Sequence, residues 1–266
     1  MSQFEGNAAR STEREELELS LADAGATAAA ATAVAQPVPF PAAEPITIPD
    51  YLRDVYHWAY LSRVGRAVFD HPAVVHSILW GNMHRLTAAV TEEIAPGTRV
   101  LQPACVYGNF SASLARAVGP TGHLVVTDVA PIQVSGCRGK LEGMPFTTVR
   151  LGDAARPTGG PYDVVACFFL LHEVPEHYKT MIVNALLDVI TPDGKVVFVD
   201  YHRPAALHPL KGVMSMVFDT LEPFAKDLWQ KEIQDYATTP GAFAWTKRTY
   251  FGGLYQKIVA RRKDRP

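Results

Sequence analysis

The stretch that decides the fold is Arg99–Asp128, RVLQPACVYGNFSASLARAVGPTGHLVVTD. Its apolar pattern predicts a short strand over 99–102, a helix over 110–118 and a second strand over 123–128. Two strands joined through a helix pair in parallel, because the helix carries the chain back to the same edge of the sheet. The stretch therefore predicts an α/β fold whose ligand binds beyond the carboxyl ends of the strands.

The same alternation continues towards the C-terminus. The further predicted elements are a helix over 132–141, a strand over 146–151, a strand over 163–170, a helix over 176–190, a strand over 195–200 and a long helical region over 209–236. Two β segments, 242–251 and 254–261, then flank the Gly252-Gly253 turn and predict an antiparallel hairpin on the sheet edge. We therefore expect a mostly parallel, seven-stranded sheet within a domain over 96–266.

The residues before this domain differ in composition. Residues 1–45 are rich in alanine and proline, which predicts a disordered tail. Residues 46–95 predict a helical cap, with one helix over 50–67 and a second over 74–90. The aromatic residues of these two helices are Tyr51, Tyr56, Trp58, Tyr60 and Trp80. The cap either packs on the main domain or also lines a pocket for a large apolar substrate.

The bulk composition excludes some functions. The chain has 266 residues, of which 48% are hydrophobic and 20% charged, so it can bury a sizeable core. The net charge of -2 gives no basis for nucleic-acid binding, which needs a concentrated basic surface. The three cysteines show no metal-ligand spacing, and no apolar run is long enough for a membrane-spanning helix. We expect a cytoplasmic protein.

An acidic residue ends the second predicted strand where a nucleoside site would have one. The gap from Gly108 to Asp128 is about 20 residues, and a carboxylate at that spacing typically binds ribose hydroxyls. The alternative is that Asp128 caps the helix that follows Pro131. Asp153, after the third strand, either contacts an adenine amino group or accepts backbone hydrogen bonds in a turn.

The loop after the first strand resembles the glycine motif of class I S-adenosylmethionine-dependent methyltransferases, E/D-x-G-x-G-x-G, but is incomplete. Its four positions hold Gln102, Ala104, Val106 and Gly108, so side chains stand where the motif lets bare backbone approach the cofactor. No G-x-G-x-x-G is present, which disfavours a nicotinamide cofactor. The residues expected to bind S-adenosylmethionine are Gln102, Ala104, Tyr107, Gly108, Asn109, Asp128, Val129, Asp153 and Ala154.

Polar side chains follow the fourth and fifth predicted strands. His172 and Glu173 come after one strand, and Asp200 and His202 end the other. Because neighbouring parallel strands end at one edge, we expect these four groups to converge. They could perform acid–base chemistry or bind a divalent ion such as Mn²⁺ or Mg²⁺, whereas a single histidine at a strand end is commonly structural. We assign catalytic roles to His172, Glu173 and Tyr107, and metal ligation to His172, Asp200 and His202.

Several strings resemble the rhodoquinone biosynthesis family RquA. They are LQPACVYGNF (101–110), TDVAPIQV (127–134), FFLLHEVP (168–175), FVDYHRP (198–204), YFGGLYQK (250–257) and ILWGN (78–82). The resemblance covers 48–262 and implies a Rossmann-like class I methyltransferase fold that converts ubiquinone to rhodoquinone. In that family S-adenosylmethionine donates its amino group and manganese assists. This chain departs from the family loop at Asn109, where the family has an aspartate.

Gln102 offers a physical reason for amino transfer. A carboxylate at this position would raise the pKa of the cofactor's ammonium group, whereas an amide leaves the amine freer to become a nucleophile. The alternatives are methyl transfer to a quinone or related aromatic molecule, and a non-catalytic quinone-binding protein. A lipid quinone such as ubiquinone would also call for peripheral contact with the inner face of the membrane. Apolar surface for this contact is expected from Trp58, Phe69, Trp80 and 209–229.

Overall fold

The computed structural model describes residues 48–54 and 70–263, whereas 1–47, 55–69 and 264–266 lie outside the described part. The predicted tail over 1–45 and most of the predicted helix over 50–67 therefore lie outside it, together with the candidate membrane residues Trp58 and Phe69. The first helix is described only as α2 (Asp50–Asp54). The boundaries drawn between tail, cap and α/β domain stay predictions.

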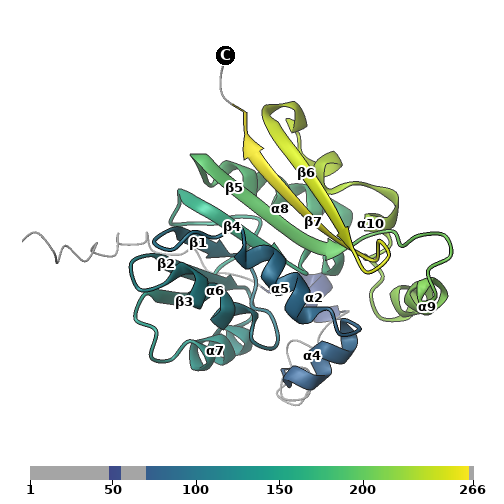
Figure 1. Ribbon diagram of the computed structural model, residues 1–266, viewed down its shortest axis with the longest axis horizontal. Coiled ribbons are helices and arrows are strands. Elements are labelled where there is room, and N and C mark those ends of the chain that lie inside the picture. The colour runs from purple at the N-terminus through teal and green to yellow at the C-terminus, as the bar shows by residue number, and fades with distance from the viewer. Residues whose placement is uncertain (1–47, 55–69, 264–266) are drawn as a thin grey trace, which may run out of the picture. The chain divides into compact units, whose positions relative to one another are not determined.

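A seven-stranded sheet forms the centre of the described domain (Figure 1). Its strands are β1 (Arg99–Gln102), β2 (His123–Asp128), β3 (Thr147–Leu151), β4 (Tyr162–Phe168), β5 (Ile190–Tyr201), β6 (Phe243–Tyr250) and β7 (Tyr255–Arg262). Their order across the sheet is β3-β2-β1-β4-β5-β7-β6. The first five strands pair in parallel, and β7 pairs antiparallel with both β5 and β6. This confirms the predicted fold class, including the hairpin at the sheet edge.

The order of the strands reverses beside β1. The chain runs outward from β1 through β2 to β3, and then returns to place β4 on the other side of β1. The chain leaves β1 towards β2 and leaves β4 towards β5, and these two connections run in opposite directions across the sheet. This divergence opens a crevice beyond the carboxyl ends of β1 and β4. The sheet itself thus determines where a ligand can bind.

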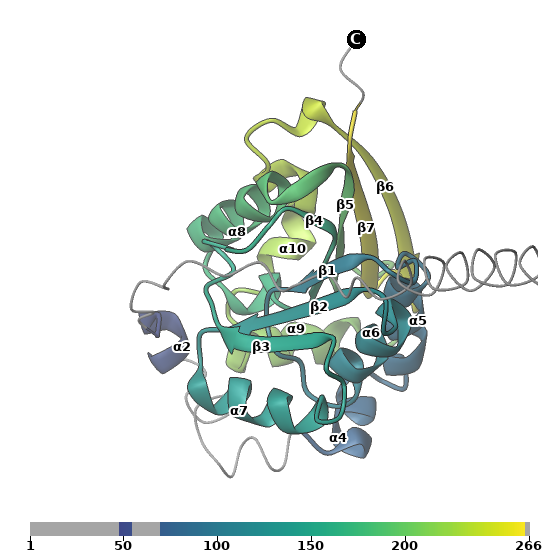
Figure 2. The same ribbon diagram turned by 90° about the vertical axis from the view of Figure 1, so that its left-hand side faces the viewer.

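Alternate residues of the central strands pack on opposite faces of the sheet. Val100 and Val164 belong to one hydrophobic cluster, and Leu101 and Val165 belong to the other. The main helices are α4 (Pro72–Ile78), α5 (Met83–Thr91), α6 (Phe110–Val118), α7 (Pro131–Lys140), α8 (Glu176–Asp188) and α9 (Lys211–Thr220). Figure 2 shows α8 on one side of the sheet and α5 and α6 on the other. No helix in the described part of the chain is long and apolar enough to cross a membrane.

The predicted single helix over 74–90 is wrong, because a turn divides it into α4 and α5. Trp80 has a φ of 49° and Gly81 a φ of 78°, and a left-handed backbone cannot continue a right-handed helix. The side-chain amide of Asn82 donates to the carbonyl oxygens of Leu79 (3.1 Å) and Trp80 (3.0 Å) and so fixes the turn. Hydrophobic periodicity alone did not reveal this break.

The predicted helical region over 209–236 is likewise divided, into α9, α10 (Asp227–Gln230) and a 3₁₀ turn. A fully buried lysine of α8 holds the segment between α9 and α10 in place. Lys179 Nζ donates to the carbonyl oxygens of Val174 (2.6 Å) and Phe224 (2.9 Å) and to Asp227 Oδ2 (2.8 Å). Burial lowers the pKa of Lys179, while the bond to Asp227 acts in the opposite direction. Three oxygen acceptors thus compensate the desolvated ammonium group.

Replacement of this lysine tests its contribution. Lys179→Met leaves two carbonyls and a carboxylate without their donor, so the free energy of unfolding should fall by about 3 kcal/mol in chemical denaturation. The control is Lys226→Met, which removes the more exposed ion pair with Asp219 and should cost less than about 1 kcal/mol. Equal losses in the two variants would contradict the role given to Lys179.

Candidate active site

A pocket opens at the carboxyl edge of the sheet, where the strand order reverses. Its lining includes six of the nine residues predicted to bind the cofactor: Ala104, Tyr107, Asp128, Val129, Asp153 and Ala154. His172 and Glu173, from the segment after β4, line the same pocket. The structure thus brings six of the nine predicted cofactor residues, and all three predicted catalytic residues, His172, Glu173 and Tyr107, to one cavity.

Asp128, at the end of β2, joins two loops of this pocket. Its Oδ2 accepts a hydrogen bond from the backbone N–H of Cys105 (2.9 Å), and its Oδ1 accepts one from Ala130 (2.8 Å). Burial raises the pKa of Asp128 to about 6, although these backbone hydrogen bonds favour the charged form. The carboxylate therefore holds the turn that precedes α7 from the pocket wall, but it does not cap the helix, whose N-cap residue Ala130 has no side-chain cap. Contact with a ribose stays a prediction.

Asp153, like Asp128, both lines the pocket and accepts a hydrogen bond from the backbone. It lines the pocket after β3, and its Oδ1 accepts a hydrogen bond from the backbone N–H of Ala155 at 2.9 Å. This is the turn geometry expected of an aspartate at such a position. Asp128 and Asp153 thus present two carboxylates on the side of the pocket formed by β2 and β3.

Three of the predicted cofactor residues do not line the pocket. Gln102 is fully buried, its Nε2 donates to the carbonyl oxygen of Ala104 at 2.7 Å, and its Oε1 has no hydrogen-bond partner among the described residues. Gly108 is buried with a φ of 74°, and Asn109 is exposed at the start of α6. Gln102 therefore supports the loop backbone through Ala104 without lining the pocket, and Asn109 does not line the pocket either.

Two charged residues outside the loop hold its backbone. The N–H of Gly108 donates to Asp70 Oδ1 at 2.9 Å, and Lys140 Nζ donates to the carbonyl oxygen of Val106 at 3.2 Å. Asp70 and Lys140 also form a salt bridge with each other. Asp70 directly precedes the segment that becomes α4, and Lys140 ends α7. We call this pair the loop latch, and it fixes a loop that lacks the usual glycines.

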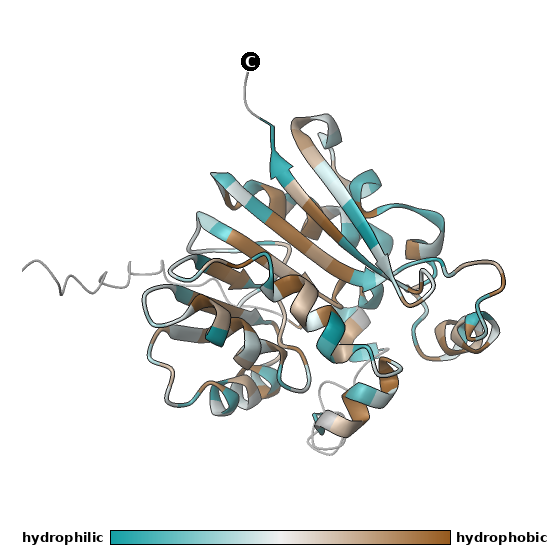
Figure 3. Cartoon of the chain, in the orientation of Figure 1, coloured by the Kyte–Doolittle hydropathy of each residue, from teal (hydrophilic) through white to brown (hydrophobic). Residues whose placement is uncertain are grey.

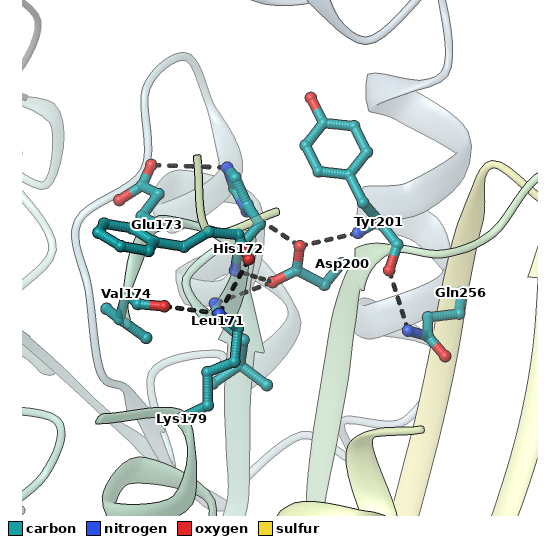
Figure 4. Close-up of polar contacts among 9 residues, drawn as sticks. Leu171, His172, Glu173, Val174, Lys179, Asp200, Tyr201 and Gln256 are labelled. Carbon is teal, nitrogen blue, oxygen red and sulfur yellow. Dashed lines mark hydrogen bonds and ion pairs between the residues drawn. The ribbon is translucent and has the colours of Figure 1, made fainter. Parts of the chain in front are cut away.

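The fourth and fifth strands bring a histidine and an aspartate together. His172 Nδ1 lies 2.9 Å from Asp200 Oδ1, and Asp200 Oδ2 accepts from the backbone N–H of Leu171 (2.9 Å) and His172 (3.3 Å), as Figure 4 shows. His172 Nε2 lies 3.8 Å from Glu173 Oε1. Burial lowers the pKa of His172, but the charge and hydrogen bond of Asp200 outweigh it and raise the pKa to about 9. Because Asp200 occupies Nδ1, the other ring nitrogen is left for chemistry.

The described residues do not form the predicted metal site of His172, Asp200 and His202. His202 Nδ1 bonds to the carbonyl oxygen of Gly253 at 2.8 Å, and its Nε2 lies 2.8 Å from Lys247 Nζ. His202 is thus bound to the β6–β7 hairpin, and its backbone N–H also donates to the carbonyl oxygen of Leu254 in the hairpin turn. Within residues 48–54 and 70–263, no three histidine, cysteine or acidic side chains gather as metal ligands.

Tyr107 lines the pocket, but its hydroxyl is engaged. Its oxygen accepts a hydrogen bond from Gln133 Nε2 at 2.9 Å, and burial raises the pKa of Tyr107. The phenol therefore stays neutral at physiological pH and is unsuited to act as a base. Tyr107 and Gln133 together form a polar part of the wall.

Sequence reasoning missed several residues that form the pocket. Phe169 belongs to the apolar run that predicted a strand to residue 170, but its φ of 50° ends the strand and places the ring in the pocket wall. Its ring contacts His172 and Tyr201 edge-on, with centroids 5.7 and 5.2 Å apart. Glu222, after α9, also lines the pocket. Nothing in the sequence pattern marked Glu222, whereas Tyr201 could have been inferred from its place beside Asp200.

Comparisons with known proteins agree with this geometry. Residues 100–194 match a family described as a methyltransferase domain. The ubiquinone/menaquinone biosynthesis C-methyltransferase UbiE of Pseudomonas fluorescens (strain SBW25) is 28% identical over 155 residues, which are 55% of this chain and 58% of that protein. The demethylmenaquinone methyltransferase of Bacillus cereus (strain ATCC 10987) is 24% identical over 177 residues, 64% of this chain and 73% of that protein.

Solved structures share the fold. An O-methyltransferase family protein from Burkholderia thailandensis has a TM-score of 0.60 at 15% identity, covering 80% of this chain and 66% of that chain. The domain thus has the Rossmann-like fold of the class I S-adenosylmethionine-dependent methyltransferase superfamily. The chain is distantly similar to the quinone C-methyltransferases named above, and it spans 58% of the length of the Pseudomonas fluorescens protein.

The loop latch can be tested by cofactor binding. Asp70→Ala removes both the acceptor for Gly108 and the partner of Lys140, so calorimetric affinity for S-adenosylmethionine should fall at least about tenfold. Asp70→Asn should lose less, because an amide oxygen can still accept from Gly108. The matched control is Lys195→Met, which breaks the ion pair with Glu93 near the start of β5 and should leave affinity unchanged. Unaltered binding in Asp70→Ala would refute the assignment.

Proposed function

We propose that this protein is an S-adenosylmethionine-dependent methyltransferase that acts on the ring of a quinol or a related aromatic molecule. The observation that carries the proposal is His172, which lines the same pocket as the cofactor loop and is held from behind by the buried Asp200. The fold supports the cofactor, and the similarity to quinone C-methyltransferases supports the class of acceptor.

The residues of the pocket suit S-adenosylmethionine. Asp128 and Asp153 offer carboxylates to hydrogen-bond donors of a nucleoside, and Ala104, Val129 and Ala154 offer small apolar walls. Ala104 and Val106 carry side chains at two positions where the motif has glycine, so the loop backbone approaches the cofactor less closely. When bound, S-adenosylmethionine supplies an electrophilic methyl group on a sulfonium sulfur.

The other part of the pocket suits a planar apolar acceptor. Helix α4 contributes Val75 and Ile78, and the segment after β4 contributes Phe169 and Leu170. Aromatic rings stack favourably against such walls, and burial of the ring excludes water. His172 lies beside this apolar surface, in the sequence directly after Phe169, Leu170 and Leu171, where a ring hydroxyl would meet it.

His172 is assigned the role of general base. Asp200 accepts a hydrogen bond from Nδ1–H and holds the ring in one orientation, which leaves Nε2 to accept a proton from a ring hydroxyl. The resulting phenolate pushes electron density to its oxygen and to the adjacent ring carbon, and the imidazolium is stabilised by Asp200. When the ring carbon gains a methyl group, the proton it carried leaves to restore the aromatic ring.

The raised pKa of His172 makes this role visible in the pH dependence. The pKa of about 9 means that the histidine is mostly charged at neutral pH, so kcat/KM should rise with pH until it loses its proton near 9. Asp200→Asn removes the charge that raises the pKa, and the rise should then occur at lower pH. The control is Glu232→Gln, beside His202, which should leave the profile in place. A limb near pH 9 that is unaffected by Asp200→Asn would exclude this base.

The same shift affects stability with a definite sign. The folded pKa of His172 exceeds its usual value of 6.5, so its charge stabilises the fold fully below pH 6.5. This stabilisation is lost as the pH rises through about 9. Thermal unfolding should show that decline in the parent protein, and Asp200→Asn should flatten it. A parent Tm that is constant between these pH values would contradict the ion pair.

Amino transfer to ubiquinone is the second candidate, and Gln102 is the observation that favours it. This position holds a buried amide in place of the motif's carboxylate, while the predicted manganese site is not formed by the described residues. The two reactions give different products. Methyl transfer adds a CH₂ unit to the ring, whereas amino transfer exchanges a methoxy group for an amino group.

Mass spectrometry of a quinol incubated with S-adenosylmethionine distinguishes the candidates. We expect a methylated ring from a demethylated menaquinol, little product with His172→Ala, and cofactor affinity retained in that variant. Exchange of a methoxy group on ubiquinone, abolished by Gln102→Glu, would establish amino transfer instead. No product from either quinone, with the cofactor bound, would refute both.

A further inference from the structure

Helix α9 is apolar on two faces, of which the core covers one. Met214 and Phe218 are buried in the main hydrophobic cluster. Val213 and Met216 point the other way, and they are 41% and 62% exposed. A helix with apolar side chains on both faces normally buries both, so the outer face of α9 indicates an interaction surface.

The apolar surface continues beyond the helix at both ends. Leu207, in the loop between β5 and α9, is 97% exposed, and Leu221 is exposed directly after the helix. Figure 3 shows the hydrophobic residues of α9 in the cartoon. Two cations lie in the same stretch, Arg203 and Lys211, and neither forms an ion pair in the part of the chain that the structure describes. We call these six residues the α9 surface.

The α9 surface adjoins the pocket. Glu222 follows Leu221 in the chain and lines the pocket, and the buried Phe218 packs against the pocket residue Tyr201 with ring centroids 4.9 Å apart. The helix therefore packs on one side behind Tyr201, a residue of the pocket wall, and is exposed on the other side. A partner bound at α9 would lie beside the pocket.

We propose that the α9 surface docks on a bilayer that contains anionic phospholipids. The charge supports this occupant, because Arg203 and Lys211, which have no ion-pair partner among the described residues, lie on either side of Leu207 in the sequence. These two cations would meet lipid phosphates while the apolar side chains enter the interface. The partner rests in part on the proposed function, since a quinol with an isoprenoid tail is dissolved in the membrane. Docking places the pocket next to that lipid.

Flotation with vesicles tests the surface without any need for activity. The full chain should float with phosphatidylcholine vesicles that contain phosphatidylglycerol, and bind less to phosphatidylcholine alone. Leu207→Glu and Met216→Glu should each weaken binding at least about tenfold, because a charge replaces an inserted apolar group. The double variant Arg203→Gln/Lys211→Gln should lose on the order of fivefold for each charge. The matched control is Met181→Glu, a 42% exposed methionine of α8.

The outcomes separate this proposal from the proposed function. Vesicle binding that Met216→Glu abolishes and Met181→Glu preserves supports docking, even if no quinol is methylated. An active enzyme that fails to float, or whose flotation is equally reduced by Met181→Glu, overturns it. A dimer in light scattering that Met216→Glu dissociates would identify a second copy as the occupant and also overturn it. If the α9 surface docks as proposed, Met216→Glu should lower the turnover of a long-tailed quinol and leave the turnover of a short-tailed quinol unchanged.

Discussion

The hydrogen bonds of Asp200 are the constraint on which the site depends. One buried carboxylate at the end of β5 accepts from two backbone N–H groups of the segment after β4 and from the ring of His172. A buried charge must be compensated, so the segment cannot move away without a large cost. The ends of two parallel strands are therefore joined by the same group that sets the protonation of His172. Folding and chemistry share one interaction here.

The cofactor loop shows how a degraded motif can still be rigid. Glycines normally let such a loop turn tightly against its ligand, and this chain retains only Gly108 of the three. Contacts from outside the loop hold its backbone in place, through the loop latch at Asp70 and Lys140 and through Asp128. The latch also connects the loop to the segment that leads into α4, which lines the pocket. The two halves of the pocket are thus held by common contacts.

The sequence predicted the sheet well because its signals are local and periodic. Apolar runs at 99–102 and 123–128 and the glycine pair at 252–253 specify strands and a hairpin through neighbouring residues alone. The positions of His172 and Asp200 at the ends of neighbouring strands also predicted that these two side chains lie close together. Orientation could not be predicted: His202 turns to the hairpin because of a carbonyl at Gly253, about fifty residues away in sequence. The break at Trp80 likewise depends on backbone torsion and on an Asn82 amide, which periodicity does not register.

The left-handed backbone of Phe169 has an evolutionary consequence. A residue with a side chain in this region carries strain of about 1 to 3 kcal/mol, so the position is kept by the packing of its ring. Replacement by glycine or asparagine would relieve that strain while it removes the ring from the pocket wall. The stability lost with the ring would thus be partly offset by the relief of backbone strain. The loss of a typical buried aromatic ring has no such compensation. The acceptor range of such a protein could therefore diverge through a single codon without a large cost to the fold.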